Sequence, residues 1–171
     1  IILSLMLSSL AIGTIITMSS SHWLMAWVGL ELNALSIIPI ITKHHYPRST
    51  EATTKYFLTQ AAASAMLLFA STTNAWHTGT WDISQLTNQP SSIMLTAALA
   101  MKLGLAPLHF WLPEVLQGTP MSTALIITTW QKLAPMALMF LTHNSLSPSI
   151  LLALGLLSAL VGGWGGLNQT Q

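Results

Sequence analysis

Six long and nearly uncharged apolar stretches constrain this chain more than any other feature. Each comes close to the roughly 20 residues that a helix needs to cross a bilayer, and together they cover residues 1–18, 23–42, 55–75, 93–115, 121–142 and 149–167. Membrane-spanning strands are about half as long and alternate apolar with polar residues. In hydrocarbon only a helix satisfies all its backbone groups within one segment. The sequence therefore predicts an all-α polytopic membrane protein with about six transmembrane helices, in a single domain over residues 1–171.

The charge content agrees with this class. Nine of the 171 residues are Asp, Glu, Lys or Arg, which is 5% against roughly a quarter in soluble domains. The net charge of +1 and the lack of a basic cluster argue against nucleic acid as a partner. The absence of cysteine excludes disulfides, thiolate metal sites and iron–sulfur ligation. Because the chain starts at Ile1 and stops at the edge of an apolar stretch, we expect it to be an internal fragment.

The loops predict the orientation of the helices. Loop 42–55 is mainly basic, with Lys43, Arg48 and Lys55 against Glu51 alone. Segment 74–92 contains Asp82 and no Lys or Arg. The positive-inside rule places loop 42–55 on the cytoplasm-like side of the membrane. Six crossings then put both ends of the chain on that same side.

Loop 42–55 also contains candidate surface sites. The adjacent His44 and His45 could be metal ligands, but neighbouring loop histidines are usually only solvated, so no metal site is expected here. Glu51 and Lys55 are four residues apart, in the order that favours pairing on a helix surface. We interpret this pair as local helix support.

Three ionisable residues lie near the middle of their predicted spans: Glu31, Lys102 and Lys132. Each costs about 2.5–3.5 kcal/mol to insert, so chance is a poor explanation for three of them. One interpretation is that they form buried ion pairs that only fix helix packing. The other is a proton or ion path, in which lysine is well suited to a relay because a desolvated ammonium group readily gives up its proton.

The fourth span is interrupted by Pro107 and Pro113. A break at Pro107 frees carbonyl groups at membrane depth, which is tolerated only where the backbone is buried in protein or lines a wet cavity. Broken helices mark ion sites in transporters, and Lys102 lies about one turn before this break. In the fifth span, Pro135 follows Lys132 by three residues and predicts a kink beside the charge.

Further polar residues are candidate accessory groups. His109 could pass protons or, as is more common for a lone histidine, bond to a freed carbonyl group. Glu114 is expected near the membrane end, facing polar protein or water. Four other residues could line a hydrated path, although Thr and Ser in membrane helices more often bond their own backbone or a neighbouring helix: Gln131, Thr59, Gln60 and Ser64.

Several segments together resemble a known family: Ser21-His22-Trp23, Trp27-Val28-Gly29-Leu30-Glu31-Leu32-Asn33, Pro47-Arg48-Ser49-Thr50-Glu51-Ala52, Lys55-Tyr56-Phe57-Leu58-Thr59-Gln60, the broken span, Trp130-Gln131-Lys132-Leu133-Ala134-Pro135 and Gly162-Gly163-Trp164-Gly165-Gly166-Leu167-Asn168-Gln169-Thr170-Gln171. The family is that of the antiporter-like membrane-arm subunits of mitochondrial NADH:ubiquinone oxidoreductase, respiratory complex I, and the likeness is to its subunit 2 group. The resemblance covers nearly the whole chain and implies that the second half of the subunit is missing.

The resemblance implies a partial antiporter-like fold of inverted five-helix repeats, in which the sixth span begins the second repeat. It maps the coupling glutamate of the family onto Glu31, the broken-helix lysine onto Lys102 and the central-axis lysine onto Lys132. It also implies a multi-pass protein of the mitochondrial inner membrane, with loop 42–55 and both ends on the matrix side and with other membrane-arm subunits, lipid, protons and water as partners. NAD and ubiquinone would serve the whole complex, and no cofactor or metal would bind to this chain.

The expected function is therefore that of a core subunit of a proton-translocating NADH:ubiquinone reductase. The subunit would contribute a proton path that couples electron transfer from NADH to ubiquinone to proton pumping, without a redox centre or NADH site in this chain. Two alternatives are open. The chain could be a structural spacer whose buried charges only fix packing, or part of a stand-alone cation/proton antiporter.

Overall fold

The computed structural model describes residues 1–43, 45–106 and 108–170. Within these residues it contains α-helices, two 3₁₀ turns and a single isolated β-bridge, between His22 and Asp82. The elements are α1 (Ile2–Ser19), α2 (Trp23–Ile41), α3 (Pro47–Thr78), η1 (Ile83–Gln85), α4 (Gln89–Leu103), α5 (Trp111–Gln117), α6 (Met121–Thr129), η2 (Trp130–Lys132), α7 (Leu133–Leu141) and α8 (Pro148–Leu167). The predicted all-α class is confirmed.

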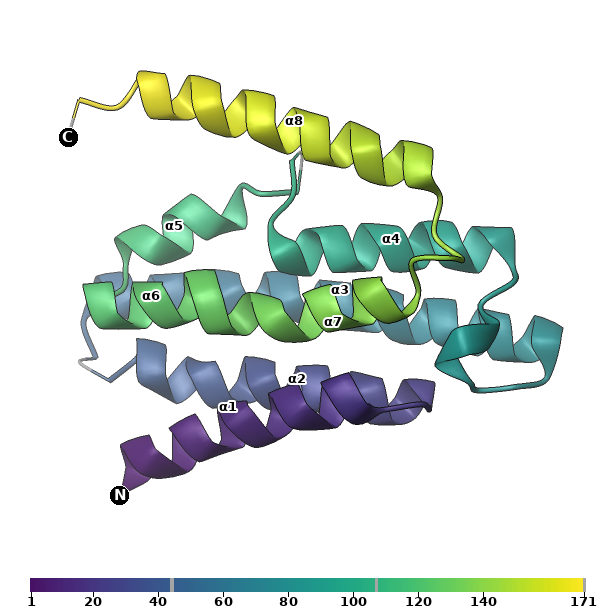
Figure 1. Ribbon diagram of the computed structural model, residues 1–171. Helices are drawn as coiled ribbons and strands as arrows, with labels where there is room; N and C mark the ends of the chain where they lie inside the picture. The colour runs from purple at the N-terminus through teal and green to yellow at the C-terminus, as the bar shows by residue number, and fades with distance from the viewer. Residues whose placement is uncertain (44, 107, 171) are drawn as a thin grey trace.

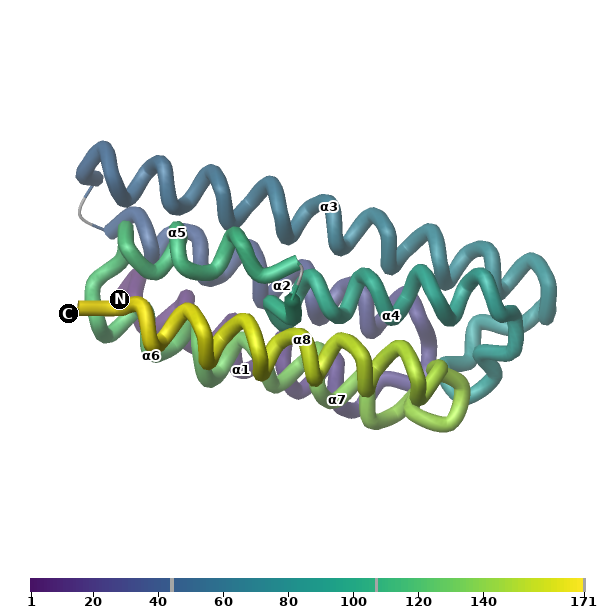
Figure 2. The backbone as a smooth tube through the Cα atoms, turned by 90° about the horizontal axis from the view of Figure 1, so that it is seen from above, coloured from purple at the N-terminus to yellow at the C-terminus, as the bar shows by residue number. Residues whose placement is uncertain are grey.

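The helices run side by side along one bundle (Figure 1). Helix α1 packs on α2 and α7, while α3 packs on α2, α4 and α5. Figure 2 shows α3 along one edge of the bundle, with α4 and α5 following each other beside it. The start of α1, the connection from α2 to α3 and the end of α8 all lie at the same end of the bundle (Figure 1).

Four stretches of helix are long and apolar enough to cross a membrane, counting only the described residues: Ile2–Ser19, Trp23–Ile41, Met121–Leu141 and Pro148–Leu167. The third and fourth predicted spans have a different form. Helix α4 has 15 residues and is about 22 Å long, shorter than the roughly 30 Å hydrocarbon layer. The short α5 follows it after a break, so two half-helices stand where one span of residues 93–115 was predicted.

Helix α3 is longer than its predicted span of residues 55–75. It has 32 residues, or about 48 Å, which exceeds the hydrocarbon thickness. Pro47 occupies the first turn, where its fixed φ suits a helix start. Gly79 caps the other end with φ 73°, a left-handed conformation that glycine adopts without strain. The first turns of α3 therefore extend beyond the membrane layer and carry the polar residues of loop 42–55.

The break in the fourth span begins at Gly104, three residues before the predicted position. Gly104 has φ 77°, and its N–H and that of Leu105 both donate to the Ala100 carbonyl oxygen at 2.9 and 3.0 Å. This is a glycine C-cap, which ends the helix without a proline. Pro107 lies outside the described residues. The prediction that Pro113 interrupts the span is wrong, because Pro113 sits in the first turn of α5, where proline is tolerated.

The fifth span is irregular beside its lysine, as the sequence predicts, but the irregular turn comes before the proline. Helix α6 ends at Thr129, the 3₁₀ turn η2 covers Trp130–Lys132, and α7 starts at Leu133. Pro135 lacks the N–H that would bond to the carbonyl group of Gln131, four residues earlier. The turn η2 is therefore the local response to Pro135, and it places Lys132 at the break.

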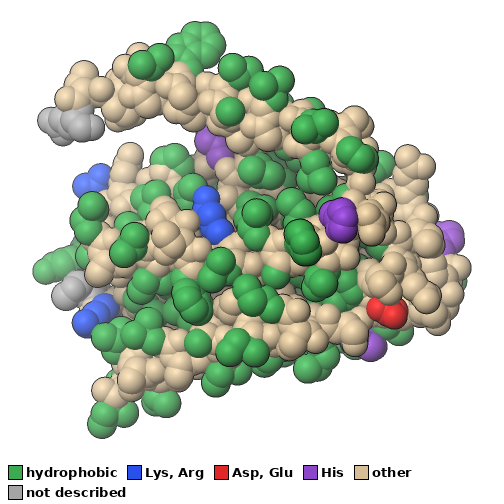
Figure 3. Space-filling model, viewed as in Figure 1, with side chains coloured by type: hydrophobic (Ala, Val, Ile, Leu, Met, Phe, Trp, Pro, Cys, Tyr) green, Lys and Arg blue, Asp and Glu red, His purple; other side chains and the backbone are tan. Residues whose placement is uncertain are grey.

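Two apolar clusters form the core. One joins α2, α3, α4 and α7 and includes Trp23, Leu67, Leu99 and Leu138. The other joins α1, α2, α3, α5 and α6 and includes Leu10, Ile37, Tyr56, Val115 and Ile127. Hydrophobic side chains are also spread over the outer face, where charged side chains are sparse (Figure 3). This surface suits a lipid environment.

Helix α8 stands apart from the bundle. None of its residues is buried, and the space-filling view shows an open gap beneath its C-terminal half (Figure 3). Its glycines, including the Gly162–Gly166 run, have open space where a side chain would project, with no described atom within 4 Å. One hydrogen bond ties α8 to the break after α4, because the Ala106 N–H donates to the Ser158 hydroxyl oxygen at 2.9 Å.

Candidate functional site

Two of the three predicted mid-membrane charges line the same internal cavity. Lys102 comes from the last turn of α4 and its side chain is 6% exposed, while Lys132 comes from η2 and is partly buried. The cavity has a volume of about 20 Å³, enough for one water molecule. The other polar residues that line it are Asn33, Tyr56, Gln60 and Gln131.

The cavity lies between the two apolar clusters. Leu30 of the first cluster and Ile127 of the second both contribute to its wall. A polar chamber thus interrupts the apolar core at the position where α4 ends and η2 disturbs the fifth span. The two backbone irregularities bring both lysines to one place, although they are 30 residues apart in the sequence.

Lys102 is held by a neutral partner. Its ammonium nitrogen donates to the Gln60 side-chain oxygen of α3 at 3.3 Å. Lys102 also lies in the last turn of α4, where the unpaired carbonyl groups of a helix end carry partial negative charge. The buried ammonium group is therefore in contact with dipoles, and no carboxylate of the described residues lies within ion-pair distance of it.

Glu31 lies in a separate, neighbouring cavity of about 10 Å³. Its Oε1 atom is buried and has no hydrogen-bond partner among the described residues. The ion pairs found in the described ranges both involve Lys55, so none joins Glu31 to Lys102 or Lys132. Three residues, Ala34, Tyr56 and Gln60, line both cavities and separate the carboxylate from the lysines.

Gln131, predicted as an accessory residue, lines the cavity directly. Its Nε2 atom donates to the main-chain oxygen of Asn33 at 3.4 Å. This bond connects η2 to α2 and fixes the turn that carries Lys132. The Asn33 Nδ2 atom is buried without a partner in the part of the chain that the structure describes, so it is available to a cavity water.

The carbonyl group freed by the break is satisfied by a residue that the sequence reasoning missed. The Trp111 indole N–H donates to the Met101 carbonyl oxygen at 2.9 Å. The Trp111 ring packs edge-on against Tyr56, with 5.9 Å between centroids, and Trp111 also lines the cavity. A tryptophan that follows a break by a few residues is a possible signal for this contact, since its indole N–H needs a buried acceptor.

His109 lies outside the described lining of the lysine cavity, and its buried Nδ1 atom neither accepts nor donates a hydrogen bond among the described residues. Its ring stacks on Phe110, with 4.6 Å between centroids. The freed carbonyl group of Met101 is occupied by Trp111 instead.

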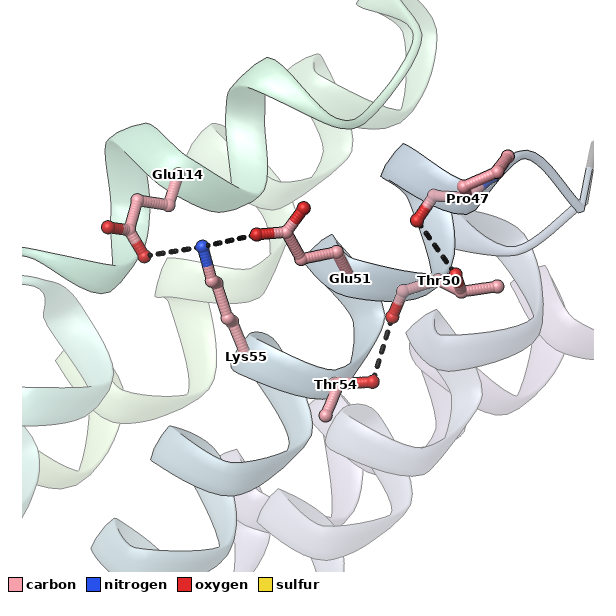
Figure 4. Close-up of polar contacts among 6 residues, drawn as sticks. All are labelled: Pro47, Thr50, Glu51, Thr54, Lys55 and Glu114. Carbon is pink, nitrogen blue, oxygen red and sulfur yellow. Dashed lines mark hydrogen bonds and ion pairs between the residues drawn. The ribbon is translucent and has the colours of Figure 1, made fainter.

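Glu114 lies at the bundle surface, away from the lysine cavity. Lys55 bridges it to Glu51, with Nζ–O distances of 3.1 Å to Glu114 and 2.9 Å to Glu51 (Figure 4). The bridge joins the start of α3 to α5, which a local pair within one helix would not do. The hydrogen bond and positive charge of Lys55 hold the pKa of Glu51 below its usual value.

Two of the predicted path residues on α3 are not part of the site. The Thr59 hydroxyl donates to the carbonyl groups of Lys55 and Tyr56 in its own helix, at 3.0 Å each. The Ser64 hydroxyl is buried without a hydrogen-bond partner among described residues. Neither residue belongs to the described lining of the two cavities.

The described ranges contain no group of three His, Cys, Asp or Glu side chains arranged to hold a metal ion. His44, one of the two loop histidines considered above, lies outside those ranges. The candidate site is built from lysine, amide, phenol and indole groups around the first cavity and from the Glu31 carboxyl group in the second.

Comparison with known proteins places this arrangement in a family. A family model described as "NADH:quinone oxidoreductase/Mrp antiporter, TM" matches residues 20–171. The chain is similar to NADH-ubiquinone oxidoreductase chain 2 of Oncorhynchus mykiss, 62% identical over 170 residues that cover 99% of this chain and 49% of that protein. With the same chain of Varanus timorensis the identity is 67% over 167 residues, covering 98% and 48%. The chain thus spans about half the length of these relatives.

Solved structures give the same answer. The chain is similar to one in respiratory complex I from Thermus thermophilus with bound aureothin, with a TM-score of 0.89 and 30% identity over 98% of this chain and 40% of that one. The membrane-bound sulfane sulfur reductase, an archaeal respiratory membrane complex, matches with a TM-score of 0.67 and 19% identity over 80% and 31% of the two chains, and so shares the fold. This chain belongs to the NADH:quinone oxidoreductase/Mrp antiporter transmembrane family.

Proposed function

We propose that this chain is part of a core membrane subunit of a proton-translocating NADH:ubiquinone oxidoreductase and that it carries a segment of a proton path. The observation that carries the proposal is the cavity shared by Lys102 and Lys132. It brings two groups that can each hold one proton to a space that fits a water molecule.

The two lysines that line the cavity can each hold or release one proton, so transfer through this space would proceed in one-proton steps. The Asn33 Nδ2 atom supplies a donor and the Gln131 side-chain oxygen an acceptor, which can orient a water molecule in the cavity. Glu31, on the other side of Gln60, can change the charge balance at Lys102 when it gains or loses a proton.

The wider context forms part of the same proposal. The relatives' name and the structural similarity to complex I support a place in the membrane arm, with other subunits of the complex as partners and with NAD and ubiquinone as substrates of the whole complex. We infer a multi-pass position in the mitochondrial inner membrane. The basic connection from α2 to α3 and both ends of the described bundle would then lie on the matrix side.

The decisive experiment is Lys102→Ala in the full-length subunit within the assembled complex. Loss of a positioned proton-transfer group costs about 10²–10⁴-fold in rate, so the number of protons pumped per NADH oxidised in proteoliposomes should fall while assembly persists. Lys43→Ala, at an exposed loop lysine, is the matched control and should pump normally. Normal stoichiometry in the assembled Lys102→Ala complex would refute the proposed path.

The same measurement separates the two alternatives. If the chain is a structural spacer, Lys102→Met should pump normally and be at least as stable, because apolar replacement of buried charge is often neutral. If it belongs to a stand-alone cation/proton antiporter, the full-length protein should not co-purify with the respiratory complex. The missing ion pair between Glu31 and the lysines favours the proton path over a packing role.

A further inference from the structure

We propose that Gln60 is a positioning residue that couples Glu31 to Lys102, an inference that rests on the proposed proton path. Gln60 is 6% exposed and lies on α3. Its side chain lines both the cavity of the two lysines and the cavity of Glu31. Glu31 and Lys102 therefore both adjoin the same amide group, and among the described residues no ion pair joins them directly.

The amide has the chemistry for such a position. Its oxygen can only accept hydrogen bonds and its nitrogen can only donate them, and both lie in one rigid plane. The oxygen is engaged by the Lys102 ammonium group at 3.3 Å. The NH₂ group therefore remains available to donate toward the Glu31 carboxylate, either directly or through one water molecule.

The side chain at position 60 must also be uncharged if it is to couple the two groups. A carboxylate at this position would pair with Lys102 and hold its proton in place, because an opposite charge stabilises the ammonium group. An apolar side chain would leave the buried ammonium group without its only described side-chain acceptor. A glutamine stabilises Lys102 and still allows release of its proton, so the charge state of Glu31 can decide when release occurs.

The surroundings of Gln60 limit what else could produce a pH effect. Three titratable groups line a cavity together with Gln60 and come from the helices packed against it or from α3 itself: Glu31 of α2, Tyr56 of α3 and Lys102 of α4. Lys132 shares the first cavity, and α5 contributes Trp111, which does not titrate. Glu31 is the only carboxyl group among the described lining residues, so a second carboxyl group introduced at position 60 has a distinct signature.

The test uses Gln60→Met and Gln60→Glu in the full-length subunit of the assembled complex, with protons pumped per NADH oxidised measured in proteoliposomes at several pH values. Gln60→Met should slow proton transfer roughly 10- to 100-fold at every pH, the effect expected for loss of one hydrogen bond to a charged group. Gln60→Glu should pump poorly at the alkaline end and recover at the acid end, because a neutral carboxyl group resembles the amide. Thr59→Val is the matched control, because Thr59 is adjacent on α3 and bonds only its own helix.

The outcomes separate this inference from the proposed function. If Lys102→Ala abolishes pumping but both Gln60 variants pump normally, the coupling role is wrong and the proton path stands. If Lys102→Ala also pumps normally, both are wrong. Equal loss in both Gln60 variants without acid recovery would show that Gln60 only supports packing and would overturn the inference. If Gln60→Met prevents assembly, the pH profile of Gln60→Glu alone decides.

Discussion

The indole N–H of Trp111 donates to the main-chain oxygen of Met101, one residue before Lys102, at 2.9 Å across the break in the fourth span. This bond satisfies a carbonyl group that the end of α4 leaves without a helical partner. It also seats the first residue of α5 against the last turn of α4. The break between α4 and α5 is therefore stabilised by a hydrogen bond of its own.

Trp111→Phe tests this closure. The change removes the N–H donor and keeps an aromatic ring against Tyr56. A buried acceptor left unsatisfied costs about 1–3 kcal/mol, so the full-length subunit in its complex should unfold at a lower temperature. Hydrogen exchange at residues 98–105 should also become faster. Trp76→Phe, at an 88% exposed tryptophan, is the control, and equal behaviour of the two variants would contradict this prediction.

Gly29→Ala tests the contact between α1 and α2. A methyl group on Gly29 would lie 2.9 Å from the Gly13 carbonyl oxygen and would collide with the Thr17 hydroxyl group. Overpacking of this kind costs about 1–3 kcal/mol, and here the obstacle includes backbone that cannot turn aside. We expect less assembled complex and a lower thermal midpoint. Val28→Ala, at the neighbouring exposed position, should have a much smaller effect, and similar losses in both would argue against the close approach.

Lys55→Gln tests the surface bridge between α3 and α5. The pKa of Glu51 is lowered by Lys55, so the pairing is fully present above the usual pKa of 4.5 and is lost as the pH falls through the lowered value. In the unmodified chain, hydrogen exchange in the first turns of α3, corrected for its intrinsic pH dependence, should therefore quicken in acid, and high salt should quicken exchange in both α3 and α5. The variant should show fast exchange throughout. Lys43→Gln serves as the control, and retained protection in Lys55→Gln would rule out the bridge as a tether.

Lys132→Arg and Lys132→Met test whether proton release or positive charge matters at η2. Arginine keeps the charge but does not give up its proton, so both variants should assemble and both should lower proton transfer by about 10²–10⁴-fold. The measurement is again protons pumped per NADH oxidised in proteoliposomes. Normal pumping by Lys132→Arg together with failure of Lys132→Met would show that only the charge is needed.

The all-α class could be predicted because apolar stretches of about 20 residues must form helices to cross a membrane. The sequence predicts the end of α4 at Pro107, but the helix ends at Gly104, which adopts a left-handed conformation and stops the helix before the proline. The predicted span of residues 55–75 begins later than α3, because apolar length reports only the part of a helix that lies in the membrane, although the Glu51–Lys55 spacing already indicated helix before it. A helix longer than the membrane can carry polar residues outside it, and Pro47 was a further signal of the helix start.

For the site, the sequence predicts only how deep in the membrane its ionisable residues lie. The central positions of Glu31, Lys102 and Lys132 follow from counting along each span, but which of them share a cavity depends on how α4 packs against α7. The bond between Lys102 and Gln60 joins residues 42 positions apart, and no periodicity reports such a contact. For the same reason the sequence left open whether the three charges form ion pairs, and the described part of the structure shows none between Glu31 and Lys102, because Gln60 of α3 lines the space between them.

The bond from Ala106 to Ser158 gives the exposed helix α8 a mechanical role. On the side of α4 the bond ends on the Ala106 main-chain N–H, and on α8 the Ser158 hydroxyl is held in turn by the bond that it donates to the Leu154 carbonyl oxygen at 2.7 Å. Ala106 is two residues beyond the left-handed Gly104 and four beyond Lys102. A sideways displacement of α8 would therefore pull on the backbone just beyond α4, and Lys102 would move with the end of that helix.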